Sequence, residues 1–137
     1  HLKEFVHLHY SKVIMGKFND RICTYYEKLP NIRPDLIYLD APDQFIAEGS
    51  VNGITTAHSD RMPMSADILT IEHFLQPGTV ILIDGRTANA RFLKTNFQRN
   101  WSYTQDSIAD INTFELNKPP LGIFNNKSLK FFLNKNI

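Results

Sequence analysis

Two aspartates, each directly after an apolar run of strand length, are the residues of this sequence best suited to chemistry. Asp40 follows the run 36–39, and Asp84 follows the run 79–83. If the two runs form neighbouring parallel strands, about 4.8 Å apart, both carboxylates reach the same rim of the sheet. Carboxylate oxygens suit Mg²⁺ or Ca²⁺ better than Zn²⁺, and they also accept hydrogen bonds from substrate hydroxyl groups. Asp40 and Asp84 are therefore the predicted catalytic residues and the predicted metal ligands.

The same two aspartates also have a purely structural interpretation. An aspartate often caps the turn or helix that follows it, and that role needs no ligand. Their joint placement favours function, because ligands of open α/β sheets bind in the crevice outside the carboxyl ends of parallel strands.

Five polar residues near the two aspartates are predicted to bind substrate: Asp43, Gln44, Arg86, Asn89 and Arg91. The first two begin the long loop 41–64, and long loops inside a compact domain are usually functional or mobile. The other three lie at the start of a predicted helix, where backbone N–H groups favour an anion such as a carboxylate or phosphate. The alternative is that Arg86 neutralises one of the aspartates and that Arg91 is a solvated helix residue.

The elements that must position these residues follow from apolar periodicity. Alternating patterns and apolar runs predict strands at residues 5–10, 21–26, 35–39, 79–83, 101–104 and 111–116. Helical spacing predicts one helix that Ser65 caps and Gln76-Pro77-Gly78 ends, and a second that Thr87 caps and that ends near Arg99. The tail after Pro120 receives no assignment.

The order of these elements predicts the fold class. A strand, a long loop, a helix, a strand and a helix in succession fit a right-handed parallel βαβ unit, and the last two strands fit an antiparallel pair at one edge. We therefore expect a single α/β domain over residues 1–137, a three-layer Rossmann-like sandwich with a mostly parallel sheet and a C-terminal antiparallel strand pair.

Composition limits the classes of partner that this chain is expected to bind. The 137 residues are 42% hydrophobic and carry 15 Lys and Arg against 14 Asp and Glu, so the net charge of +1 gives no long-range field for nucleic acid. Apolar runs fall far short of the roughly 20 residues of a membrane span, and no secretory signal is recognised. A single cysteine, Cys23, cannot form an intramolecular disulfide, which is compatible with the cytoplasm. A small-molecule substrate is the expected partner.

Two segments also resemble a known family. Residues 34–43, PDLIYLDAPD, and 74–84, FLQPGTVILID, are similar to class I S-adenosylmethionine-dependent methyltransferases, and the similarity extends over roughly residues 33–116. In that family the fourth strand ends in an acidic turn, a helix ends in Pro-Gly, the fifth strand ends in an acidic residue, and the last two strands are antiparallel. The layout resembles the catechol O-methyltransferase-like subgroup, in which these acids coordinate magnesium, although Gly85 stands where that subgroup usually has Asn.

The resemblance implies S-adenosylmethionine as cofactor, Mg²⁺ as metal, and methyl transfer to a small or sugar-like acceptor. The glycine-rich loop of the family is not found, because the six glycines form no GxGxxG pattern. The chain is therefore expected to correspond to the C-terminal half of the domain, without the N-terminal cofactor-binding strands, and to be inactive alone. The alternatives are a non-catalytic α/β module that binds an anionic or sugar ligand, and a homodimer in which a second copy covers an exposed sheet edge.

Overall fold

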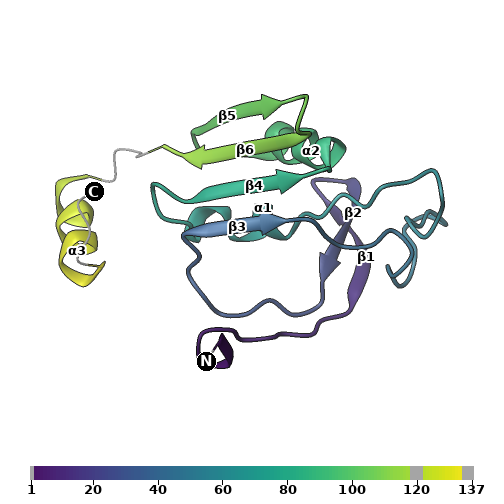
Figure 1. The fold of residues 1–137 in the computed structure, drawn as a ribbon, viewed down its shortest axis with the longest axis horizontal. Helices are drawn as coiled ribbons and strands as arrows, with labels where there is room; N and C mark the ends of the chain where they lie inside the picture. Colours follow the sequence, from purple (N-terminus) through teal and green to yellow (C-terminus); the bar gives the residue numbers. More distant parts are fainter. Residues whose placement is uncertain (1, 118–121, 134–137) are drawn as a thin grey trace.

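A computed structural model describes residues 2–117 and 122–133, which form two β-sheets and three α-helices (Figure 1). The strands are β1 (Val13–Phe18), β2 (Arg21–Tyr26), β3 (Leu36–Leu39), β4 (Val80–Asp84), β5 (Trp101–Asp106) and β6 (Ile111–Leu116). The helices are α1 (Asp67–Ile71), α2 (Thr87–Asn96) and α3 (Ile123–Leu133), with short 3₁₀ helices at Leu2–Glu4 and Glu72–Phe74.

Only one pairing in the larger, four-stranded sheet is parallel. The strand order is β3-β4-β6-β5, with β3 parallel to β4 and β6 antiparallel to both of its neighbours. The predicted parallel pairing of the two apolar runs is confirmed, and Leu39 lies beside Ile83. The predicted Rossmann-like sandwich with a mostly parallel sheet is wrong. An apolar run indicates burial but does not encode strand direction. The apolar pattern of the sequence therefore could not predict that β6 lies between β4 and β5.

The predicted three layers are also wrong, because α1 and α2 contact each other and cover the same face of this sheet (Figure 1). Leu39 and Ile83 point into the covered face and are buried. On the other face Leu36 and Tyr38 are 62% and 58% exposed. Successive side chains of a strand alternate between faces, so an uninterrupted apolar run can still leave one face open.

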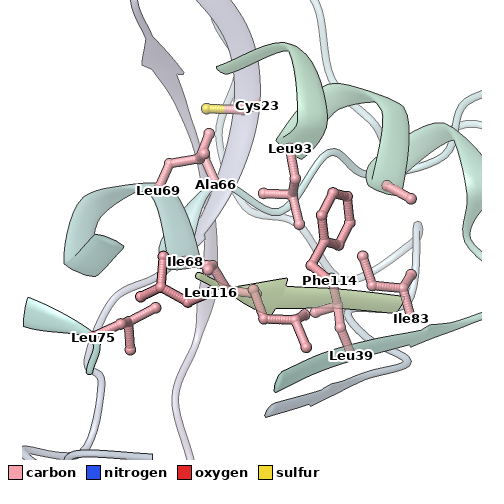
Figure 2. Close-up of a cluster of buried hydrophobic side chains, with 12 residues drawn as sticks. Cys23, Leu39, Ala66, Ile68, Leu69, Leu75, Ile83, Leu93, Phe114 and Leu116 are labelled. Carbon is pink, nitrogen blue, oxygen red and sulfur yellow. The ribbon is translucent and has the colours of Figure 1, made fainter. Parts of the chain in front are cut away.

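The main core lies between the sheet, α1 and α2, and Figure 2 shows side chains from both helices meeting those of the sheet. Phe114 on β6 is 1% exposed and is the largest fully buried side chain among the described residues. Its ring centroid lies 4.8 Å from that of Tyr103, 5.2 Å from that of Phe97 and 6.4 Å from that of Trp101. Three aromatic rings thus pack against Phe114.

The smaller sheet is the hairpin β1–β2. Its turn residues Asn19 and Asp20 have φ values of 47° and 62°, the left-handed pair that two-residue hairpin turns favour. Thr24 on β2 bonds through its backbone to Met64 and Ala66, which ties the hairpin to the chain just before α1. The strand predicted at 5–10 is wrong: this segment lies outside any strand and is exposed, since alternation alone supplies no pairing partner.

The helix ends differ from their predicted positions. Ala66 is the N-cap of α1 without a side-chain bond, and the Ser65 hydroxyl instead donates to the Asp67 carboxylate at 2.9 Å. Thr87 lies inside α2 as its first residue, and that helix ends at Asn96, three residues before the predicted end at Arg99.

The 3₁₀ segment after α1 is held by a buried acid. The carboxylate of Glu72, 2% exposed, accepts hydrogen bonds from the backbone N–H groups of Gln98 and Arg99 and from the Trp101 indole. One side chain thus joins the end of α1 to the connection between α2 and β5.

Within the described residues, no helix is both long and apolar enough to cross a membrane.

Candidate functional site

The parallel register of β3 and β4 brings the two strand-ending aspartates to one rim. Because Leu39 pairs with Ile83, the next residues along both strands are Asp40 and Asp84. Side-chain alternation directs them away from the covered core, to the face that also carries Tyr38. The Tyr38 hydroxyl donates a hydrogen bond of 2.5 Å to Asp84 Oδ2 across the two strands.

Both carboxylates act on the Tyr38 hydroxyl. The hydrogen bond to Asp84 raises the pKa of the Tyr38 phenol, and the negative charges of Asp84 and Asp40 act in the same direction. The phenol therefore keeps its proton at neutral pH and remains a hydrogen-bond donor. It occupies one oxygen of Asp84 and leaves the other oxygen to an incoming donor.

Arg86 completes this cluster by holding the chain after β3. Its Nε lies 3.5 Å from Asp40 Oδ1, and its terminal nitrogens donate to the backbone carbonyls of Pro42 and Asp40, at 2.8 and 3.3 Å. The Arg86 side chain is 13% exposed, against 59% for that of Asp40. The structural alternative for Arg86, pairing with Asp40, is confirmed. We call the cluster of Tyr38, Asp40, Asp84 and Arg86 the acidic rim.

The other predicted substrate-binding residues do not join the contacts of the acidic rim. Asn89 is 1% exposed, and its amide forms two hydrogen bonds with the backbone of Ser65, so it anchors the chain before α1. Asp43 accepts from the Phe45 N–H, and Gln44 donates to backbone carbonyls of the 41–64 loop. Arg91 is exposed on α2.

Two residues that sequence reasoning missed belong near the rim. Tyr38 lies two positions before Asp40 on a strand, so period-two alternation could have placed both side chains on one face. Asp110, from the turn between β5 and β6, accepts from the Thr87 hydroxyl at 2.9 Å, and its backbone carbonyl accepts from the Gly85 N–H. No local pattern pointed to Asp110, because its placement depends on β6 pairing with β4.

The acidic rim does not fit a magnesium site. Among the described residues, no group of three or more His, Cys, Asp or Glu side chains could hold a metal ion. Of the two predicted ligands, Asp84 already accepts from Tyr38, and Asp40 lies beside the Arg86 guanidinium. A magnesium ion prefers near-octahedral oxygen coordination and would meet a fixed positive charge at this place.

The described residues do not fit S-adenosylmethionine either. The family's cofactor loop is a glycine-rich connection after a strand, whereas the strands before β3 form a hairpin joined through Asn19 and Asp20. Gly16 lies within β1 against the Tyr25 ring, where an added Cβ would come within 2.8 Å of ring carbons. That glycine serves close packing in the hairpin, and we derive no step through the cofactor.

A second buried carboxylate lies away from the rim, at the start of α1. Asp67 is 7% exposed; its Oδ1 accepts from the Tyr26 N–H and its Oδ2 from the Ser65 hydroxyl, both at 2.9 Å. Burial raises the pKa of Asp67, and the two hydrogen bonds offset part of that effect. Burial raises the pKa values of Cys23, Tyr25 and Tyr26, and the charge of Asp67 raises them further, so these groups are neutral between pH 4 and 7.

The raised pKa of Asp67 predicts a pH-dependent stability. The folded chain holds this proton to higher pH than the unfolded chain, whose aspartates titrate near about 3.9. The contribution of Asp67 to the free energy of unfolding therefore falls as pH rises from about 4 through the raised pKa, and it stays low above that pH. Urea denaturation between pH 4 and 7 should show a decline in the wild type that Asp67→Asn lacks. Parallel pH profiles for the two proteins would contradict this assignment.

No family model, no curated protein and no solved structure matches the chain. The interpretation of the site therefore rests on its geometry.

Proposed function

We propose that the acidic rim binds a small neutral molecule through its hydroxyl groups, as the acceptor site of a methyltransferase-like protein. The observation that carries this proposal is the meeting of Asp40, Asp84 and Tyr38 at the carboxyl ends of two parallel strands. That end of a sheet is where ligands of α/β proteins bind. The partly exposed carboxylates are acceptors for ligand hydroxyl groups, and charged acceptors form the stronger hydrogen bonds.

The charge balance favours a neutral ligand over an anion. The rim carries two carboxylates and one guanidinium, and both terminal nitrogens of Arg86 already donate to backbone carbonyls. Arg86 therefore offers little to a carboxylate or phosphate, whereas an anion would meet the negative charges of Asp40 and Asp84. Among the alternatives, a sugar-like ligand is compatible with this rim and an anionic one is not favoured.

The relation to methyltransferases is part of the proposal and rests on local order. Acids that end two parallel strands, Pro77-Gly78 before the second of them, and a final antiparallel pair all agree with the resemblance. With Asp84 as hydrogen-bond acceptor, a ligand hydroxyl group would be oriented and made more electron-rich at its oxygen. No described residue supplies the methyl group, so the proposal extends to acceptor binding alone.

Replacing both rim carboxylates should weaken the binding of hydroxylated ligands. We expect catechol or methyl α-glucoside to shift the amide NMR signals of residues 38–41 and 84–86 in the wild type. Asp40→Asn/Asp84→Asn should reduce the affinity about tenfold or more, because hydrogen bonds to charged groups are worth about 1.5–3 kcal/mol each and tenfold is about 1.4 kcal/mol. The double variant Asp20→Asn/Asp60→Asn makes the same charge change at exposed positions elsewhere and should leave the affinity unchanged.

Absence of these shifts at 50 mM of either compound, or equal affinity in the two double variants, would contradict the proposal.

The cofactor is tested separately by calorimetric titration with S-adenosylhomocysteine. We expect no micromolar binding to this chain, because the described residues before β3 form a hairpin in place of a cofactor loop. Micromolar binding would show that some other segment holds the cofactor.

A further inference from the structure

A groove of about 770 Å³ lies beside the edge strand β3, between that strand, α1 and the segment that precedes it. Its wall is mostly apolar and includes Leu29, Ile32, Leu36, Ile37, Ile71 and Phe74. Sites for small molecules usually have volumes of roughly 300–1,000 Å³, with apolar walls and a few polar groups that fix the ligand. The groove falls in that range, so its few polar groups decide which ligand it suits.

Asp67 is the acid in the wall of this groove, next to Ser65 and Tyr26. Arg33 is the cation in the same wall, and its guanidinium pairs with Asp35 at 3.5 Å. The two hydrogen bonds to the Asp67 carboxylate come from the Tyr26 backbone N–H and the Ser65 hydroxyl group, which are both neutral donors. Nowhere in residues 2–117 and 122–133 does a cationic side chain lie within ion-pair distance of Asp67. A carboxylate has about four lone-pair positions, so these two hydrogen bonds leave acceptor capacity on a side chain that lines the groove.

A buried carboxylate without a cation is costly, and a ligand that brings positive charge removes that cost. The other titratable groups near Asp67, which are Cys23, Tyr25 and Tyr26 on β2, are neutral at pH 7 and do not compete for this role. We propose that the groove binds a small organic cation, with an apolar body against β3 and α1 and an ammonium or amidinium group that donates to Asp67.

This site differs from the acidic rim, because Asp67 recognises the ligand here and the two rim aspartates do not. The groove wall includes Tyr38 and Ala41, which lie next to the rim, but neither Asp40 nor Asp84 lines it. The cation site therefore does not depend on the proposed hydroxyl-binding function. Substitution of the two rim aspartates should leave it intact, and substitution of Asp67 should leave the rim intact.

The test compares two ligands of the same shape that differ in charge. Phenethylamine is protonated at pH 7, whereas 2-phenylethanol is neutral, and each is titrated into the isotopically labelled chain and followed by amide NMR shifts. We expect phenethylamine to shift residues 26, 37 and 65–71 and to bind at least tenfold more tightly than the alcohol. In Asp67→Asn, which retains an acceptor for the Tyr26 N–H, this preference should disappear.

A matched pair of variants at Leu36 provides a second test that does not depend on the folding of the Asp67 variant. Leu36 lines the groove and is 62% exposed, so either charge is tolerated there by the fold. Leu36→Lys should lower the phenethylamine affinity severalfold, whereas Leu36→Glu should maintain or raise it.

Four results would overturn the proposal. They are equal affinity for the amine and the alcohol, no shifts at 10 mM amine, identical affinity in the Lys and Glu variants, and shifts confined to the acidic rim. A fifth is a dimer, seen by light scattering, whose interface protects the groove residues from the amine, because a second copy would then be the occupant.

Discussion

Phe114→Ala is expected to lower the free energy of unfolding by about 3–5 kcal/mol, the usual cost of removing a buried phenylalanine. Phe114 is 1% exposed and contacts three aromatic rings, of which Phe97 and Tyr103 are nearest. Phe97 also stacks on Trp101 at 4.6 Å, which restricts how far these rings can move into the space left behind. The loss therefore includes both apolar transfer and an unfilled cavity.

Urea denaturation measures this loss directly, and thermal denaturation should show a midpoint lower by about 10 °C or more. Phe124→Ala is the matched control, because the Phe124 side chain on α3 is 80% exposed, and the free energy should change by less than about 0.5 kcal/mol. A loss below about 1 kcal/mol in Phe114→Ala would mean that β6 does not lie between β4 and β5 in the core.

Glu72→Ala is expected to cost a similar amount, about 3–5 kcal/mol, for a different reason. Removal of the carboxylate leaves the N–H groups of Gln98 and Arg99 and the Trp101 indole without their acceptor. Each unsatisfied buried donor costs about 1–3 kcal/mol, and water that enters the space recovers part of this. The main effect should be loosening between α1 and the start of β5.

Glu72→Gln keeps one acceptor oxygen but places an NH₂ group near the donors. We expect Glu72→Gln to lower the free energy of unfolding by about 1–2 kcal/mol, less than Glu72→Ala, when each variant is compared with the wild type by urea denaturation. Glu27→Ala, at an exposed position, should have little effect. If Glu72→Ala unfolds within about 0.5 kcal/mol of the wild type, the buried network does not stabilise the fold.

The sequence predicted strands β3 and β4 well because their apolar runs are local signals. The runs 36–39 and 79–83 indicated strands, and the long connection between them favoured a parallel pair, which the structure confirms. The antiparallel pair of β5 and β6 was also predicted correctly, since both segments alternate and a short polar turn joins them.

The remainder of the fold depends on contacts that no local pattern records. That β6 would lie beside β4 is a choice between sheet edges, and it fixes both the mixed sheet and the position of Asp110. Strand-like alternation at 5–10 found no partner. The buried role of Asn89 depends on the path of the chain at Ser65, which periodicity cannot foresee.

Some residues of the candidate sites could likewise be placed from the sequence, and others could not. Asp40 and Asp84 could be placed from the strand ends, and the pairing of Arg86 with Asp40 was one of two interpretations of the sequence. The burial of Asp67 could not be predicted, because its depth depends on the hairpin β1–β2 packing against α1. Burial of polar residues is a tertiary property, so both the stabilising Glu72 and the groove acid Asp67 became visible only in the structure.

The cross-strand NOE pattern of the isotopically labelled chain is the most direct check on the arrangement from which the site is derived. We predict contacts that ascend together along both strands, from Leu36 with Val80 to Leu39 with Ile83, and contacts between the Tyr38 ring and Asp84. Contacts that ascend along one strand while they descend along the other would make the pair antiparallel, would send Asp40 and Asp84 to opposite edges, and would contradict the account.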